Sequence, residues 1–205
     1  MKKYLIEFVG TFFLVLVIGL TGNPIAIGCI LMVMIYMGGN ISGAHYNPAV
    51  TLAIMIRGKI NGKEAAIYWL FQILGAFAAA VLFYLIWGRT FAPAPRTDIN
   101  ILKPLAIEML FTFALASVVL NVATSAKAAG NSYYGLAIGF TVLAAAFAGG
   151  PISGGAYNPA VGIGPCLVDT MMGSGSMKYL WIYLVGPLAG AAAAGFFYKM
   201  ANPDD

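Results

Sequence analysis

The sequence predicts an all-α membrane protein with six membrane-spanning helices and two half-length helices, arranged as an inverted repeat. Three observations lead to this fold class. Hydrophobic residues make up 61% of the 205 residues and charged residues only 9%, whereas soluble domains carry about 25% charged residues. Six apolar stretches are suited to crossing a hydrocarbon core of about 30 Å. The decapeptide ISGAHYNPAV at 41–50 recurs as ISGGAYNPAV at 152–161, with eight of ten residues identical.

The six predicted spans are apolar helices. The first begins with basic residues, as a signal peptide does, but Glu7 interrupts it and no small-x-small cleavage site follows. We therefore interpret it as a retained helix. In chain order the predicted spans are Tyr4–Leu20, Pro24–Gly38, Glu64–Trp87, Lys103–Thr124, Ser132–Gly149 and Lys178–Lys199.

Two further apolar stretches, Pro48–Arg57 and Pro159–Val168, are too short to span, since ten helical residues rise only about 15 Å. Each begins with Asn-Pro, which favours a helix start because proline suits the first helical position and Asn is a favoured cap. The small residues before each Asn are not expected to form helix. Membrane depth permits their unpaired carbonyls only where the backbone lines a wet cavity.

The order of these elements repeats along the chain. Two spans, a half-helix and a third span occupy residues 1–90, and the same order follows in residues 101–201, so one domain, 1–205, is built from two repeats. Both repeats open alike, with EFVGTFF from Glu7 and EMLFTFA from Glu108. Because each repeat has an odd number of spans, the second is predicted to be inserted upside down. In such proteins paired short segments mark a site at the midplane.

The two half-helix starts are predicted to meet there and to form a site for neutral molecules. Each helix N-terminus carries roughly half a positive charge, which repels cations. The side-chain amides of Asn47 and Asn158 can donate hydrogen bonds to a solute. Backbone carbonyls before each half-helix are candidate acceptors: those of Gly43, Ala44 and His45 in the first copy, and of Gly154, Gly155 and Ala156 in the second.

Basic residues favour an orientation with both termini in the cytoplasm. With the N-terminus inside, seven of the eleven lysines and arginines fall on the cytoplasmic side and four outside, in the sense of the positive-inside rule. We therefore expect a multi-pass protein of the cell (plasma or inner) membrane, in contact with lipid. Small residues spaced four apart, such as Gly135 and Gly139, indicate close helix packing within one subunit or between subunits.

Several other function classes lack a sequence signal. The net charge of +4 comes from scattered residues without an aromatic-basic stripe, so we expect no nucleic-acid partner. Cys29 and Cys166 have no metal-ligand spacing and no sign of a disulfide, and are predicted to be small buried thiols. His45 has no Cys, His or carboxylate at ligand spacing, so neither a metal nor a cofactor is predicted. The sequence shows no nucleophile–base pair, so no enzyme activity is predicted.

Over essentially its whole length the sequence resembles the aquaporins, the major intrinsic protein family. The stretch SGAHYNPAVT is close to that family's first signature, and WIYLVGPLAG in the last span matches as well. The resemblance implies an hourglass fold, a pore through each monomer and a homotetramer. It also implies that Glu7 and Glu108 brace the carbonyl-bearing loops. The doubled motif that carries the resemblance consists of Asn47, Pro48 and Ala49, and of Asn158, Pro159 and Ala160.

The chain departs from the family after the second motif, where the usual Arg is replaced by Val161. By their spacing from the two Asn residues, the other three positions of the family's selectivity filter fall on Ile27, Ala146 and Gly155. The resemblance then implies a wide, apolar constriction without a fixed charge. We expect a passive channel for small neutral solutes: water together with glycerol-sized polyols, urea or metalloid hydroxides.

Alternative functions remain open at this stage. Within the channel class, Val161 is also compatible with a dedicated arsenite or metalloid channel, and an ordinary water channel is a further possibility. Tyr183 resembles the residue found in water channels and Leu184 the residue found in glycerol channels, so this pair does not distinguish the two kinds of channel. Outside the class, a coupled carrier would need a coupling charge at the midplane, where the two Asn residues are neutral. A structural membrane protein would need a closed pore.

Overall fold

The computed structural model describes residues 1–173 and 175–205, and the secondary structure within these ranges is entirely helical. Six helices are long and apolar enough to cross a membrane, which confirms the predicted fold class. Two shorter helices and two short connecting turns complete the secondary structure of the described residues. The elements are α1 Lys2–Thr21, α2 Pro24–Ser42, α3 Pro48–Arg57, α4 Gly62–Trp87, α5 Leu102–Val119 continued by η1 Leu120–Thr124, η2 Ala126–Ala128, α6 Tyr134–Ser153, α7 Pro159–Met171, η3 Ser176–Tyr179 and α8 Leu180–Ala201.

Three helices run at least three residues past their predicted ends: α2, α7, and α6, which continues past Gly149 to Ser153. Helix α2 continues past Gly38 to Ser42 and ends where Gly43 adopts a left-handed φ of 86°. Gly38 lies inside the helix and makes room for a neighbouring ring: a Cβ there would lie 2.0 Å from the Tyr46 hydroxyl. Helix α7 continues past Val168 to Met171 and includes Pro165 in its interior.

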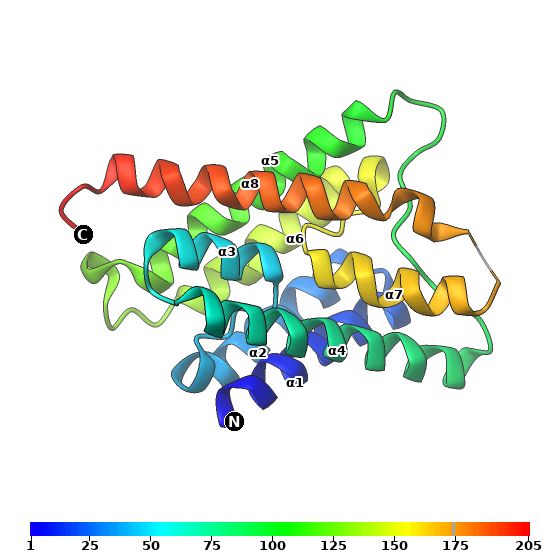
Figure 1. Ribbon diagram of the computed structural model, residues 1–205, viewed down its shortest axis with the longest axis horizontal. Coiled ribbons are helices and arrows are strands. Elements are labelled where there is room, and N and C mark those ends of the chain that lie inside the picture. Colours follow the sequence, from blue (N-terminus) through cyan, green and yellow to red (C-terminus); the bar gives the residue numbers. More distant parts are fainter. Residues whose placement is uncertain (174) are drawn as a thin grey trace.

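The long helices pack in pairs that follow the repeat (Figure 1). Helix α1 packs against α4 in the first repeat, and α5 packs against α8 in the second. Both contacts depend on glycine: a Cβ on Gly75 would lie 2.4 Å from the Phe8 carbonyl oxygen, and one on Gly190 would lie 2.1 Å from that of Met109. Backbones that approach this closely are typical of helix packing in lipid. Each short helix lies against the last helix of the other repeat, α3 on α8 and α7 on α4.

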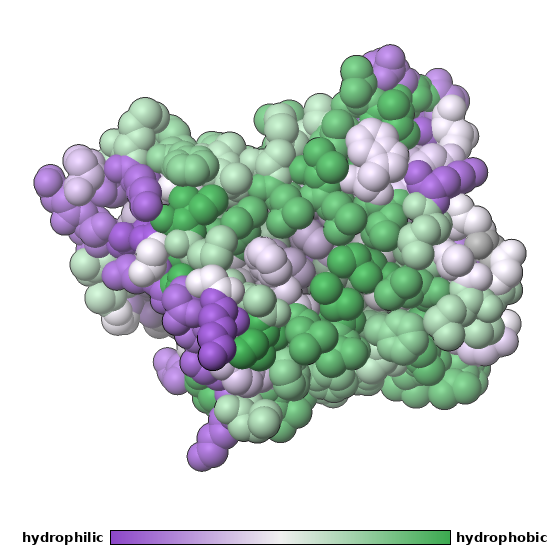
Figure 2. Space-filling model, viewed as in Figure 1, coloured by the Kyte–Doolittle hydropathy of each residue, from purple (hydrophilic) through white to green (hydrophobic). Residues whose placement is uncertain are grey.

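The bundle has two distinct ends. In Figure 1 the C-terminus and the connection between α5 and α6 lie at one end, and the segment 88–101 lies at the other. Lys3 pairs with Glu64 at the start of α4, so the N-terminal residues lie at the same end as Asp205. We call this end the proximal face and the opposite end the distal face. A broad hydrophobic surface separates hydrophilic residues at the two ends (Figure 2).

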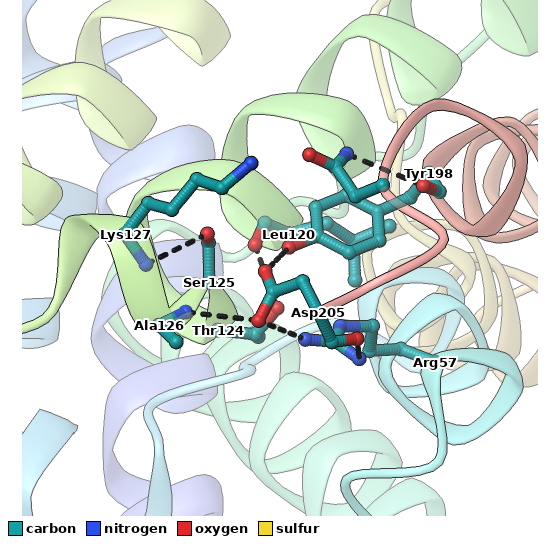
Figure 3. Close-up of polar contacts among 9 residues, drawn as sticks. Arg57, Leu120, Thr124, Ser125, Ala126, Lys127, Tyr198 and Asp205 are labelled. Atoms are coloured by element: carbon teal, nitrogen blue, oxygen red, sulfur yellow. Dashed lines mark hydrogen bonds and ion pairs between the residues drawn. The ribbon is translucent and has the colours of Figure 1, made fainter.

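Asp205 ties three elements together at the proximal face (Figure 3). Its carboxylate accepts hydrogen bonds from the Tyr198 hydroxyl of α8 and, at 3.2 Å, from the backbone N–H of Ala126. The Arg57 guanidinium at the end of α3 donates to the Asp205 carbonyl oxygen at 2.7 Å. The same guanidinium lies 4.7 Å from the centre of the Tyr198 ring. The α5–α6 connection is thereby held against α3 and α8.

Candidate functional site

The two Asn-Pro helix starts meet in the middle of the bundle. Asn47 caps α3 by accepting from the Ala49 N–H at 2.8 Å, and its Nδ2 donates across to the Tyr157 carbonyl at 2.9 Å. In the second repeat, Asn158 makes the equivalent contacts: it accepts from the Ala160 N–H at 2.9 Å and donates to the Tyr46 carbonyl at 2.9 Å. Pro48 and Pro159 occupy the first helical positions. Because each amide has two N–H groups, one per Asn is left for another acceptor.

The loops before the half-helices hold an unusual backbone conformation. Ala44, Tyr46 and Tyr157 have φ values of 50°, 48° and 49°, in the left-handed region that non-glycine residues rarely adopt. Such a conformation persists only where the surroundings impose it. Two buried carboxylates, one from each repeat, accept from backbone N–H groups of these loops.

Glu7 of α1 is completely buried and accepts four hydrogen bonds. Its Oε1 accepts from the Ser42 hydroxyl at 2.7 Å and from the His45 N–H at 3.0 Å. Its Oε2 accepts from the Tyr46 N–H at 2.7 Å and from the Gln72 side-chain amide at 2.8 Å. This one side chain thus joins α1, the first loop and α4.

Glu108 of α5 performs the equivalent task in the second repeat and is also completely buried. Its Oε1 accepts from the Ser153 hydroxyl at 2.6 Å and from the Ala156 N–H at 3.0 Å, and its Oε2 accepts from the Tyr157 N–H at 2.6 Å. A buried polar group is costly unless it is hydrogen-bonded, so each carboxylate and its loop stabilise one another.

The two repeats differ in the residue that supports each brace, and the sequence predicted this role for neither residue. Gln72 in α4 donates to the Thr51 hydroxyl at 3.0 Å as well as to Glu7. The residue 111 positions later is Tyr183 in α8, whose hydroxyl donates to the Ser153 carbonyl at 2.6 Å. Gln72 is a polar group in the middle of an apolar span, a signal that could have pointed to it. Tyr183 lies in the first turn of α8 and gives no such signal.

Tyr46 and Tyr157 anchor the loops with their side chains. The Tyr46 hydroxyl donates to the Met34 carbonyl in α2, and the Tyr157 hydroxyl donates to the Ala145 carbonyl in α6, both at 2.9 Å. The two tyrosines are 0% and 1% exposed, respectively. Their rings therefore pack behind the loops, while their backbone carbonyls receive the bonds from the two Asn amides.

A narrow central space passes through the point where the half-helices meet. It measures about 40 Å³ and opens into a proximal vestibule of about 280 Å³ and a distal vestibule of about 380 Å³. A water needs roughly 10–15 Å³ of such volume, so the central space has room for a short file of waters. Of the predicted carbonyl residues, Ala44, His45, Gly155 and Ala156 line this space, Gly43 the proximal vestibule and Gly154 the distal one.

The four predicted filter positions come together in the structure. Ile27 from α2, Ala146 from α6, Gly155 from the second loop and Val161 from α7 all line the central space. The first three also border the distal vestibule. Among the described residues that line the central space there is no Asp, Glu, Lys or Arg. The passage combines aliphatic side chains with backbone carbonyls and the two Asn amides.

Six long helices around two half-helices, whose capped starts enclose a narrow passage between two vestibules, define a membrane channel of the hourglass type. The family described as major intrinsic protein matches residues 1–198. The chain belongs to this family.

Relatives of known name agree with this assignment. The chain is 37% identical to Aquaporin NIP1-4 of Oryza sativa subsp. japonica, with 98% of this chain and 77% of the relative covered. It is also 37% identical to Aquaporin NIP1-1 of Zea mays, with 97% and 74% covered. Among solved structures, the aquaglyceroporin from Plasmodium falciparum has the same fold, with a TM-score of 0.89 over 98% of this chain and 97% of that one at 23% identity. The protein is thus an aquaporin-type channel, not an enzyme, and a multi-pass membrane protein.

Proposed function

We propose that this channel conducts water together with small neutral solutes of the size of glycerol, urea or a metalloid trihydroxide, by passive flow. The observation that carries the proposal is the set Ile27, Ala146, Gly155 and Val161, which we assign as the selectivity filter. These residues border the passage with small or medium aliphatic groups and no charge. A solute with carbon atoms can pass such a wall without leaving a charged or polar side chain unpaired.

The proposed exclusion of cations depends on the two half-helix starts. A fixed positive charge about 4 Å from a cation would be worth about 4 kcal/mol at an effective dielectric constant of 20, and Val161 supplies none. The N-termini of α3 and α7 still direct roughly half a positive charge each toward the centre of the passage. We therefore assign cation exclusion to the midplane rather than to the filter.

Polar groups on one side of the passage would guide the solute. We assign the carbonyl groups of residues 43–45 and 154–156 as hydrogen-bond acceptors and the free N–H groups of Asn47 and Asn158 as donors. Leu14, Leu31 and Leu115 supply an apolar wall to the same space. A molecule with hydroxyl groups and a hydrocarbon edge fits a passage of this mixed character.

We also propose an orientation and an assembly. The excess of basic residues at the proximal face favours a cytoplasmic position for that face and for both termini, with the protein in the plasma or inner membrane. Large hydrophobic side chains are exposed around the bundle, among them Leu85, Leu110 and Phe196. Some of this surface would contact lipid and some would contact neighbouring subunits of a homotetramer, each subunit with its own pore.

Stopped-flow light scattering on proteoliposomes tests the proposed function. Wild-type protein is compared with Val161→Arg and with Val161→Met, which adds length without charge, under sucrose, glycerol and arsenite gradients. We expect wild type to conduct water and glycerol, and Val161→Arg to lose glycerol while water flow persists. A wild type that passes neither faster than empty vesicles would overturn the proposal. Arsenite flow exceeding glycerol flow would favour a dedicated metalloid channel.

A further inference from the structure

The residues that line the central space come in pairs related by the internal repeat. Residues of α1 and α5 correspond at a separation of 101, as Leu14 and Leu115 do, and all others correspond at 111, as Leu31 and Val142 do. All twenty lining residues have their counterpart in the lining. Each position in one half of the passage can therefore be compared with the equivalent position in the other half.

The passage has a neck at each end, which we define by the residues shared between the central space and a vestibule. The distal neck, shared with the distal vestibule, consists of Ile18, Ile27, Ala146 and Gly155. The proximal neck, shared with the proximal vestibule, consists of Val119, Ile138, Ile35 and Ala44. The two necks correspond residue by residue through the repeat. The pairs are Ile18 with Val119, Ile27 with Ile138, Ala146 with Ile35, and Gly155 with Ala44.

The proximal neck contains the larger side chains. Ile138 equals its counterpart Ile27, and Val119 is one methylene smaller than Ile18. Against that small loss, Ala44 places a methyl group where Gly155 has a hydrogen. Ile35 places a branched butyl group where Ala146 has a methyl. The adjoining positions in the half-helices, Val50 and Val161, are identical and add equal bulk at both ends.

The burial of these residues also indicates that the proximal neck is the tighter of the two. All four residues of the proximal neck are at most 7% exposed, whereas Ile18, Ala146 and Gly155 of the distal neck are only half-buried. Ile35 itself is 3% exposed and lies in the middle of α2. A β-branched side chain in a helix has essentially one favoured χ1 rotamer, so it does not readily swing aside.

We propose that the proximal neck is a second selectivity filter and that Ile35 sets the upper size limit for solutes. This inference rests on the proposed function. The distal neck, without a charged side chain, admits polyols, and the solute then meets the tighter ring around Ile35. The specificity-determining residue lies in the repeat opposite to the one in which Val161 replaces the family's Arg.

Matched substitutions at Ile35 and Ala146 test this inference. The ratio of erythritol to water permeability is measured in proteoliposomes for wild type, Ile35→Ala and the exchange variant Ile35→Ala with Ala146→Ile. We expect Ile35→Ala to raise the ratio about tenfold. This is the lower end of the change in discrimination that follows when methylene groups in an apolar site are added or removed. The exchange variant restores bulk at the other neck and should bring the ratio back toward the wild-type value. Ile86→Ala, at a position 55% exposed on α4, is the control and should match wild type.

The possible failures are distinguishable. If Ile35→Ala leaves the ratio unchanged while Ile27→Ala raises it, the distal neck limits size and the inference is overturned, although the proposed function stands. If wild type conducts water but Ile35→Ala and Ile27→Ala both leave polyols excluded, neither neck limits size. If wild type conducts no solute at all, the proposed function itself fails. Size-exclusion chromatography checks folding, and Ile35→Val, which removes one methylene, provides a milder variant with a smaller expected rise.

Discussion

The Arg57 guanidinium lies 3.2 Å from the carboxylate of Asp205, and both side chains are buried, with 7% and 6% exposed. The pair joins α3 to the final residues described, 148 positions later in the sequence. Through the Asp205 bond to the Ala126 N–H, it also fixes the connection that borders the proximal vestibule. Figure 3 shows the carboxylate between the α5–α6 connection, the Tyr198 ring and Arg57.

Stability should therefore depend on the ionisation of Asp205. The hydrogen bond from Tyr198 lowers the pKa of this carboxyl, and the contacts with Ser125, Ala126 and Arg57 lower it further. A group whose pKa is depressed in the folded state stabilises the protein above its unfolded pKa of about 3.9, and this contribution is lost as pH falls through the folded value. We expect the melting temperature in detergent to fall more steeply below about pH 4 in wild type than in Asp205→Asn. Parallel curves would contradict this prediction.

Replacing Glu108 by Gln should destabilise the second loop. The carboxylate accepts from a hydroxyl and two backbone N–H groups, and a Gln amide would turn an N–H₂ group toward at least one of these donors. Hydrogen bonds to a charged group contribute about 1.5–3 kcal/mol each. We expect a loss of at least about 2 kcal/mol in the free energy of unfolding, together with lower water permeability.

Glu64→Gln is the matched control for this prediction. Glu64 pairs with Lys3 at the partly exposed start of α4, where an ion pair contributes only about 0–1 kcal/mol. Thermal unfolding in detergent and osmotic shrinkage of proteoliposomes measure both variants. Equal losses in Glu64→Gln and Glu108→Gln would show that Glu108 has no special role in holding the loop.

Hydropathy and helix-start chemistry predicted most of the fold. The six spans and both half-helices follow from apolar length and from Asn-Pro, because these signals are local. The end of α2 did not follow, because Gly38 and Gly39 resemble a helix end in the sequence, whereas the helix ends only where Gly43 adopts a left-handed φ. The prediction that Cys29 is buried was wrong: it is exposed on α2, whereas Cys166 is buried.

The site was predictable where the two repeats coincide and less so where they differ. The Asn pair and the Glu pair stand out because the sequence repeats them. The supporting roles of Gln72 and Tyr183 were missed because their positions correspond but their chemistry does not. Membrane spans also hide which face is buried, since residues facing lipid and residues facing the core are both apolar. The pairing of the necks therefore emerged only once the lining residues were known.

Gly162→Ala should destabilise the second repeat by overpacking. A Cβ at this position would lie 2.7 Å from the Cβ of Tyr183, the residue whose hydroxyl holds the Ser153 carbonyl. Overpacking of this kind costs about 1–3 kcal/mol. We expect a lower melting temperature and reduced water flow. Gly150→Ala is the control for the melting temperature, because a Cβ there meets no atom within 4 Å apart from its chain neighbours and the backbone of its own helix. If the melting temperature of Gly162→Ala equals that of wild type, Tyr183 shifts aside without a cost in stability.

Asn158→Asp should make the channel leak cations without disturbing the start of α7. Asp and Asn are comparable helix caps, so the bond from the Ala160 N–H is retained. The carboxylate, however, cannot donate to the Tyr46 carbonyl, and it adds a negative charge to a passage whose described lining has no charged Asp, Glu, Lys or Arg. An opposite charge about 4 Å from a cation is worth about 4 kcal/mol at an effective dielectric constant of 20.

Even about a third of that energy would raise the cation flux roughly tenfold. The flux is measured with K⁺-loaded proteoliposomes at pH 8, which favours the ionised form of the aspartate, with water permeability recorded in parallel. Asn61→Asp makes the same chemical change at the cap of α4, where the Asn side chain accepts from the Glu64 N–H at 2.9 Å outside the passage. We expect Asn61→Asp to remain as tight to K⁺ as wild type. If Asn158→Asp is equally tight, cation exclusion does not depend on the charge at the half-helix starts, and another part of the passage must supply it.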